Sequence, residues 1–307
     1  MEFNKQQNLL VIWYNINMDI KYIVDLDNLM VKEYLDIKGV SRNLKKKARV
    51  NNLIYVNGVN VKNYDIVHLG DELVIKIDEK LNPNFVINES ELDVLYEDDY
   101  LLIVNKPSGV ASQPSQKHQF DNLISMVTNY FIKKNISSNI HIVTRLDYST
   151  SGIVIIAKSG FVHFEMSKID ILKKYLCLIV GSMSEVEGSI RLPIRRCVEH
   201  NIKRWVYEDG KMAITHYKVL REYENSSLID VTLETGRTHQ IRVHFAYLSH
   251  PLIGDKLYGD SDGDLMLHCY HIKFIHPITN EIVEIKRFPI WLKEDIHAWF
   301  SNASFFW

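Results

Sequence analysis

The sequence lacks the features that mark membrane proteins, disulfide-rich secreted proteins and zinc clusters. No apolar run in its 307 residues approaches the ~20 residues that span a bilayer. Its three cysteines are Cys177, Cys197 and Cys269, and their spacing fits neither a disulfide framework nor a zinc site. The first residues are polar and then too briefly apolar for a signal peptide. We therefore expect a cytoplasmic protein that contacts no membrane.

An excess of positive charge is also missing. The chain has 36 Lys and Arg residues and 38 Asp and Glu residues, a net charge of -2, so any nucleic-acid contact must come from a local patch. The interval between Asp36 and Asp65 is such a patch, because it contains no acidic residue. Its seven basic residues are Lys38, Arg42, Lys45, Lys46, Lys47, Arg49 and Lys62. A positive face of this kind attracts RNA phosphates, although many charge runs only face solvent.

Length and local composition predict how the chain divides. The length suggests about two domains. A stretch over 81–91 that contains Pro83 and several asparagines is typical of a linker between them. We therefore expect an N-terminal extension over 1–20, a small α/β domain over 21–80 and a larger domain over 92–307.

Two helices and a hairpin are expected in the small domain. Helical spacing over 28–36 predicts a first helix that stops at Gly39, and Ser41 is the expected N-cap of a second, basic helix. Asn57-Gly58 stands between two runs that favour strands, which predicts a type I′ turn.

Strands dominate the prediction for the larger domain. The exceptions are a helix over 123–131 with Asp121 as its cap, a basic loop from Arg191 to Arg204, and a terminal helix that starts at Pro289.

The stretch over 141–158 is the strongest candidate for a functional site. Arg145-Leu146-Asp147 precedes a run of turn-forming residues, and the β-branched run over 153–157 predicts a short buried strand. Asp147 is therefore a carboxylate on a tight loop that a rigid strand holds in place, which suits catalysis. The alternative is an Asx-turn, in which the carboxylate only caps its own backbone.

Four motifs follow one another in a specific order. They are Asn105-Lys106-Pro107, Arg145-Leu146-Asp147 with Thr150-Ser151-Gly152, Lys174-Tyr175, and the run from Glu234 to Arg242 followed by His250 to Asp255. In this order and spacing they resemble the RluA-type pseudouridine synthases over about 92–299. The sequence departs from the family pattern at Thr144 and Gln113, where the family often has histidine. Neither position is the family's catalytic carboxylate.

The basic segment in front resembles a second family, the αL-type RNA-binding domain of a ribosomal protein and of many RNA-modifying enzymes. The matching pieces are Ser41-Arg42, the basic helix, Val56-Asn57-Gly58 and Leu69-Gly70-Asp71.

The first resemblance implies both a fold and a reaction. The fold is α+β, with a mixed, mostly antiparallel sheet in the catalytic domain, and it follows the small α/β RNA-binding domain. The reaction is the isomerisation of specific uridines in RNA to pseudouridine, which requires no cofactor. Asp147 matches the essential aspartate, as nucleophile or as base. Arg242 is the expected cation beside it. Tyr175 is expected to stack on the target base and to accept its carbon 5 proton.

RNA is the expected partner, and the target uridine must leave its stack to reach these groups. The residues expected to contact RNA are Arg145, Leu146, Arg237, His239, Gln240, Lys45, Lys46, Lys47 and Arg49. Large-subunit ribosomal RNA is the expected substrate, and transfer RNA is the alternative. We expect a monomer. The histidines near these motifs have no metal-ligand spacing, so no metal is expected.

Two other classes of function fit the sequence less well. A non-catalytic RNA-binding or ribosome-assembly factor with the same fold is disfavoured because Asp147, Tyr175 and Arg242 are all intact. A hydrolase built on Ser149 or Ser151 and a histidine is disfavoured because the sequence has no Gly-x-Ser-x-Gly elbow.

Overall fold

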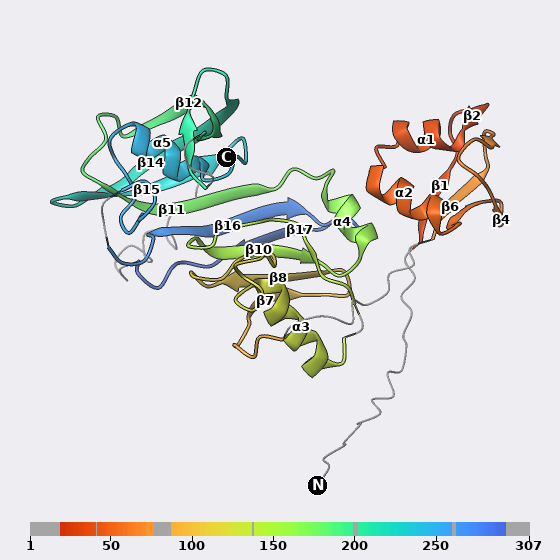
Figure 1. The fold of residues 1–307 in the computed structure, drawn as a ribbon, viewed down its shortest axis with the longest axis horizontal. Helices are drawn as coiled ribbons and strands as arrows, with labels where there is room; N and C mark the ends of the chain where they lie inside the picture. Colours follow the sequence, from red (N-terminus) through yellow and green to blue (C-terminus); the bar gives the residue numbers. More distant parts are fainter. Residues whose placement is uncertain are drawn as a thin grey trace, which may run out of the picture.

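The computed structural model describes residues 19–40, 42–76, 87–136, 138–198, 202–259 and 262–292. In this part of the chain the strands form a four-stranded sheet, a two-stranded sheet and a large sheet of eleven strands (Figure 1). Several expected features lie outside the described residues: most of the extension, most of the linker, the Ser41 cap and the continuation of the helix expected from Pro289.

Residues 19–40 and 42–76 form the smaller unit, which we call the N-terminal module. Its four-stranded sheet is antiparallel, in the order β1-β6-β3-β4. The strands of the module are β1 (Ile20–Ile23), β2 (Leu29–Met30), β3 (Ile54–Val56), β4 (Val59–Asn60), β5 (Ile66–Val67) and β6 (Glu72–Ile75), with β2 paired to β5. The predicted type I′ turn is confirmed, because Asn57 and Gly58 both have positive φ, at 49° and 81°.

Two helices complete the core of the module. The first, α1 (Val31–Ile37), begins later than the spacing over 28–36 predicts, because the two residues before it pair with β5 as a strand. The chain turns at Gly39, where φ is 72°, in agreement with the predicted stop. The second helix, α2 (Arg42–Val50), carries most of the basic patch.

The large sheet runs through the rest of the described chain. Its strands are β7 (Asp93–Glu97), β8 (Leu101–Lys106), β9 (His141–Ile142), β10 (Ser151–Ala157), β11 (Leu172–Val180), β12 (Glu187–Arg196), β13 (Arg204–Val206), β14 (Lys211–Glu222), β15 (Ser226–Leu233), β16 (Leu267–Ile275) and β17 (Ile282–Lys286). The order is β13-β12-β14-β15-β11-β16-β10-β8-β7, with β17 beside β16 and β9 beside β10. Among these described pairs, β10 and β16 run parallel and the others are antiparallel. The predicted α+β class with a mixed, mostly antiparallel sheet is confirmed.

Three helices accompany this sheet: α3 (Leu123–Lys134), α4 (Gly160–Met166) and α5 (Gln240–Tyr247). The expectation that Asp121 caps α3 is wrong. Asn122 is the N-cap, and its side-chain oxygen accepts a hydrogen bond from the Ser125 N–H at 3.0 Å. Asp121 instead lies 2.7 Å from a ring nitrogen of His118.

The basic segment from Arg191 to Arg204 is only in part the loop that its charge suggested. Its first six residues belong to β12 and its last residue opens β13, and Ile190 and Ile194 are buried on one face of β12 while charged residues alternate with them.

Gly152 lets the first residues of β10, directly after the Asp147 loop, lie close to β16. Its φ is 120°, and a Cβ atom here would stand 2.3 Å from the carbonyl oxygen of Cys269 on β16, so a larger residue would push the two strands apart. The run over 153–157 that follows is fully buried, as predicted for a core strand. The loop before β10 is therefore anchored to the centre of the sheet.

The short helix α4 links the two units. Phe164 of α4 is buried and belongs to the same hydrophobic cluster as Ile20, Tyr34 and Leu73 of the N-terminal module. Figure 1 shows the module beside this helix at one end of the large sheet. The module is therefore docked on α4 through apolar contacts.

Candidate active site

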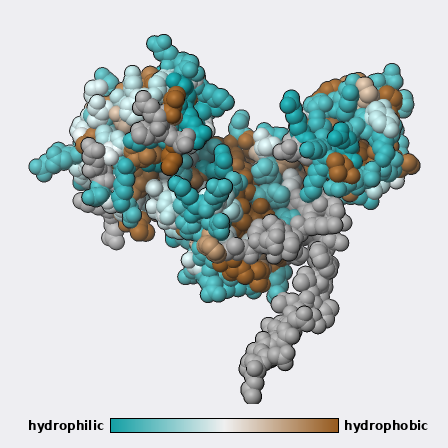
Figure 2. Space-filling model, in the orientation of Figure 1, coloured by the Kyte–Doolittle hydropathy of each residue, from teal (hydrophilic) through white to brown (hydrophobic). Residues whose placement is uncertain are grey.

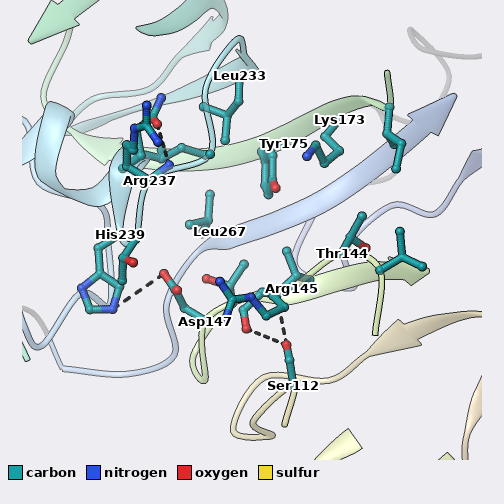
Figure 3. A pocket seen from close by; sticks show the side chains of 18 of the residues that line it. Ser112, Thr144, Arg145, Asp147, Lys173, Tyr175, Leu233, Arg237, His239 and Leu267 are labelled. Carbon is teal, nitrogen blue, oxygen red and sulfur yellow. Dashed lines mark hydrogen bonds and ion pairs between the residues drawn. The ribbon is translucent and has the colours of Figure 1, made fainter. Parts of the chain in front are cut away.

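A cavity of about 530 Å³ lies between β11, the loop before β10, α4 and the start of α5 (Figure 3). The volume falls in the range of ~300–1,000 Å³ that is usual for pockets that bind small molecules. Its polar lining includes Arg145, Asp147, Lys173, Tyr175, Arg237 and His239. In the space-filling view, apolar side chains lie in the hollow between the N-terminal module and the lobe around β12 and α5, and hydrophilic side chains flank them (Figure 2).

The Asp147 loop is clamped from both sides by the turn that follows β8. Ser112 Oγ donates to the Leu146 carbonyl at 2.7 Å and accepts from the Leu146 N–H at 3.0 Å (Figure 3). On the other side of Asp147, Ser108 Oγ donates to the Ser149 carbonyl at 2.9 Å. Two hydroxyls from one turn thus hold the backbone before and after the carboxylate.

Lys106 adds a third tie to the same loop. It is fully buried, and its Nζ donates to the carbonyls of Pro107 at 2.9 Å, Val110 at 2.7 Å and Tyr148 at 3.4 Å. Burial lowers the pKa of Lys106 to about 7, although the charge of Asp147 acts in the opposite direction. The lysine of the Asn-Lys-Pro motif therefore joins the turn after β8 to the Asp147 loop through hydrogen bonds.

Asp147 presents its carboxylate to the cavity. Its backbone carbonyl closes the turn by accepting from the Thr150 N–H at 3.1 Å. Its side chain is 29% exposed, and Oδ2 lies 3.9 Å from Arg242 Nη1 and 3.9 Å from His239 Nε2 (Figure 3). The carboxylate is thus shielded from much of the solvent and faces one cation and one imidazole.

Arg242 is held mainly by a second acid. Its Nε and Nη2 donate to the two oxygens of Asp255 at 2.8 and 2.7 Å. Both side chains are buried, and Asp255 also accepts from the N–H groups of Leu257 and Tyr258. The bidentate pair of Arg242 is therefore made with Asp255, and Nη1 is the group that lies toward Asp147.

His239 is oriented by Tyr258. The Tyr258 hydroxyl accepts from the Arg204 N–H at 2.8 Å and lies 2.8 Å from His239 Nδ1. Burial, followed by the charges of Arg242 and Arg204, lowers the pKa of His239 against the pull of Asp147. The ring is therefore neutral at neutral pH. A Tyr258 hydroxyl that donates to Nδ1 leaves the proton on Nε2, which faces Asp147.

Tyr175 lies in the middle of β11 and lines the cavity. It is paired with Cys269 on β16, at a position where the register of the two strands shifts. Burial, and then the neighbouring Cys269 and Asp147, raise the pKa of Tyr175 well above its ordinary value. Its hydroxyl therefore keeps its proton at neutral pH.

The residues expected to contact RNA fall into two groups. Arg145 and Arg237 are exposed at the cavity, and Leu146 and His239 also line it. Lys46, Lys47 and Arg49 are exposed on α2 of the N-terminal module. Lys45 differs from these three, because it pairs with Asp36 and its side chain is only 14% exposed.

Gln240, also expected to contact RNA, lines the cavity and is bonded within the protein. This side chain is buried, and its oxygen accepts from Thr235 Oγ1 and the Arg237 N–H. Its nitrogen donates to the Ile214 carbonyl and to Thr215 Oγ1. Gln240 therefore fastens the loop before α5, and its contact with RNA stays a prediction.

Comparison with known proteins identifies the family to which this cavity and these motifs belong. A family model described as RNA pseudouridylate synthase matches residues 100–247. An uncharacterized RNA pseudouridine synthase of Bacillus subtilis is 35% identical over 262 residues, which are 82% of this chain and 93% of that relative. The ribosomal large subunit pseudouridine synthase D of Buchnera aphidicola is 32% identical over 282 residues, 84% of this chain and 88% of that relative.

This chain belongs to the RNA pseudouridylate synthase family. It is an isomerase that converts uridine in RNA to pseudouridine, and the predicted RluA type is confirmed. Among solved structures, human RNA pseudouridylate synthase domain containing 1 matches with a TM-score of 0.58 at 23% identity, over 73% of this chain and 98% of that one. Human RNA pseudouridylate synthase domain containing 4 matches with a TM-score of 0.54 at 20% identity, over 65% of this chain and 89% of that one. These two likenesses show that the synthase shares their fold.

Sequence reasoning missed several residues of the synthase's site. Asp255 was part of a motif, but nothing indicated that it would bind Arg242. Tyr258 and Ser112 carried no signal, since each acts on a residue far away in the chain.

Among the described residues, no group of three or more His, Cys, Asp or Glu side chains could hold a metal ion. None of the helices in the described segments is long and apolar enough to cross a membrane.

Proposed function

We propose that Asp147 is the catalytic carboxylate of this synthase and that large-subunit ribosomal RNA is its substrate. The position of Asp147 supports its assignment as the catalytic carboxylate. Its loop is tied down on both sides, and its carboxylate faces a cavity of nucleotide size beside Arg242 and His239. A group that must react with a ribose needs a position that is fixed and partly shielded from water.

The isomerisation can be balanced around this carboxylate. The bond between ribose C1′ and N1 of the base breaks, and a bond between C1′ and C5 forms. C5 loses a proton and N1 gains one, so the product has the composition of the substrate. Asp147 begins the reaction by adding to C1′ as a nucleophile or by removing the 2′ proton as a base. Both routes need an ionised carboxylate and a uridine that has left its stack.

The neighbouring groups then take distinct parts. Arg242, fixed by Asp255, keeps a positive charge beside Asp147. Tyr175 supplies a ring against which the base packs. Its hydroxyl is assigned the C5 proton late in the reaction: because its pKa is raised, it passes its own proton to water as it takes the proton from C5, and N1 takes up a proton from water.

Two observations support ribosomal RNA as the substrate. Relatives from Buchnera aphidicola and Pseudomonas aeruginosa carry the name ribosomal large subunit pseudouridine synthase D. The N-terminal module exposes Lys46, Lys47 and Arg49 on one helix, which suits contact with RNA phosphates. We assign 21–80 to RNA binding and 92–307 to catalysis, in a monomeric protein that acts in the cytoplasm.

Mapping pseudouridines in ribosomal and transfer RNA, from cells with and without the gene, tests this proposal. We expect at least one large-subunit site to disappear with the gene, to return with the wild-type chain and to stay absent with Asp147→Asn. A site that disappears from transfer RNA instead would refute the substrate assignment. Restoration by Asp147→Asn would refute the role of the carboxylate.

A further inference from the structure

A stacked pair of aromatic rings stands at the mouth of the cavity, directly beside Asp147. The rings of Tyr148 and His118 are 4.4 Å apart between centroids and 27° from parallel. Tyr148 lines the cavity and is the residue after Asp147 in the chain. None of the steps assigned above uses this pair.

The pair is rigidly supported. His118 Nδ1 lies 2.7 Å from Asp121, at the turn that leads into α3. The Tyr148 backbone carbonyl accepts from Lys106 Nζ and from the Gly109 N–H at 3.0 Å. The pKa of Asp121 lies below its ordinary value because of His118 first and, to a smaller extent, Tyr148. The ring of Tyr148 is thus held in place by its backbone and by the histidine behind it.

Tyr148 is nevertheless open to solvent. His118 covers one face of its ring, yet 42% of the residue is exposed. Leaving this much of a tyrosine ring in water forgoes apolar burial. A ring that is backed on one face and still partly exposed is a suitable platform for another flat group.

The substrate brings such a group to this place. A target uridine lies within an RNA strand, so its two neighbours must remain at the mouth of the cavity when its ribose reaches Asp147. Flipping the uridine also uncovers the faces of the neighbouring bases. Unstacked bases in RNA are commonly received by aromatic side chains.

We propose that Tyr148, backed by His118, stacks on a base adjacent to the target uridine and so holds the opened strand. This inference rests on the proposed placement of the uridine at Asp147. It adds a substrate-binding residue that contributes to the choice of site, because purines stack more extensively than pyrimidines. Tyr148→Phe keeps the ring and should bind RNA as the wild type does, whereas Tyr148→Leu removes the platform.

The test measures the binding of a stem-loop RNA that carries the mapped target uridine. All proteins carry Asp147→Asn, so that binding is measured without turnover. Tyr148→Leu should weaken binding about fivefold or more, as expected for the loss of one stacked base. His118→Ala should weaken it less, and Tyr148→Phe should leave it unchanged. Tyr247→Leu is the matched control, because Tyr247 is 49% exposed and lies outside the cavity lining.

The decisive comparison removes the partner base. In separate RNAs, the nucleotides on the 5′ and 3′ sides of the uridine are replaced by abasic residues. On the RNA that lacks the stacked base, the Asp147→Asn protein should bind equally well with and without Tyr148→Leu. A Tyr148→Leu defect that persists on both abasic RNAs, or no defect on the intact RNA, would overturn the proposal. Turnover by Asp147→Asn at a rate near that of the wild type would instead overturn the catalytic assignment, and the binding result would stand independently of it.

Discussion

Arg242 gives its two short hydrogen bonds to Asp255, at 2.8 and 2.7 Å, and meets Asp147 at 3.9 Å. One buried acid therefore holds the arginine so that its remaining nitrogen faces a second, more exposed acid. Because Asp255 also accepts from two backbone N–H groups, its position is independent of the RNA. The charge beside Asp147 is thus in place before substrate arrives, which is the arrangement that electrostatic preorganisation requires.

Replacing this arginine should reduce both activity and stability. Arg242→Met leaves the Asp255 carboxylate buried without its partner, which typically costs ~3–5 kcal/mol. It also removes the cation from Asp147, so turnover should fall strongly, whereas Arg237→Met should mainly weaken RNA binding. Thermal unfolding and single-turnover rates of both variants test this. The assignment is wrong if Arg237→Met abolishes turnover while Arg242→Met barely slows it.

A double variant separates folding from chemistry. In Arg242→Met with Asp255→Asn, the buried charge is gone and the amide oxygen can still accept from the two backbone N–H groups. Much of the lost stability should return, while turnover should stay low because Asp147 still lacks its cation. Recovery of turnover along with stability would show that Arg242 serves only the fold.

The Tyr258 hydroxyl should affect the rate of catalysis, because it fixes which ring nitrogen of His239 carries the proton. Tyr258→Phe removes the hydroxyl that fixes the His239 ring, so Nε2–H no longer faces Asp147 in every molecule. The loss of one neutral hydrogen bond is worth about 1 kcal/mol, so we expect kcat to fall roughly fivefold with little change in RNA affinity. Tyr96→Phe, which loses a hydroxyl bonded to Asp98 outside the cavity lining, is the control. Equal rates for the two variants would contradict the role given to Tyr258.

Buried histidines should make the protein sensitive to acid. Burial lowers the pKa of His268 from 6.5 to about 4, so the unfolded chain binds a proton before the folded chain does. The stability that depends on neutral His268 is complete above pH ~6.5 and is lost as pH falls through about 4, a change of about 3 kcal/mol. Denaturant unfolding between pH 7 and 4 measures it.

His268→Gln provides the comparison for that prediction. The variant should be less stable than the wild type at pH 7, because His268 contacts Ser151 and the Arg287 carbonyl. Its stability should nevertheless fall less steeply with acid. Replacement of His68, whose pair with Asp27 is exposed, by glutamine should alter the acid dependence much less than His268→Gln does. The same steep fall in His268→Gln as in the wild type would disprove this origin of the acid sensitivity.

The exposed side of α2 should control RNA affinity and leave the chemistry alone. Changing Lys46, Lys47 and Arg49 to glutamine should weaken binding and flatten its salt dependence, by ~0.7 in the log–log slope for each lost phosphate contact. Turnover at saturating RNA should change little. Lys45→Gln is the matched control, because Lys45 pairs with Asp36 and should leave the salt slope unchanged. An unaltered slope in the triple variant would mean that these residues only face solvent.

The sequence predicted the strand that follows the Asp147 loop, because β-branched runs and turn residues are local signals, and the resemblance carried by the four motifs implied the fold class. Motif order also indicated the family. Side-chain pairing could not be predicted in the same way, since it depends on the order of strands in the sheet. Asp255, for example, stands 13 residues after Arg242 but reaches it through the turn after α5. The cap of α3 was mispredicted for a different reason: Asp121 and Asn122 are neighbours with similar preferences for the N-cap, and Asn122 is the one that accepts from the Ser125 N–H.

The most direct test of this account is the single-turnover rate of purified Asp147→Asn on RNA that carries the mapped uridine. The amide has nearly the same size as the carboxylate, but it is neither a base nor a useful nucleophile. We predict that Asp147→Asn folds and binds this RNA within a few-fold of the wild type, because other contacts hold the RNA. It should form pseudouridine at least roughly 1,000-fold more slowly than the wild type. Formation of pseudouridine by Asp147→Asn at a rate near that of the wild type would contradict the central claim.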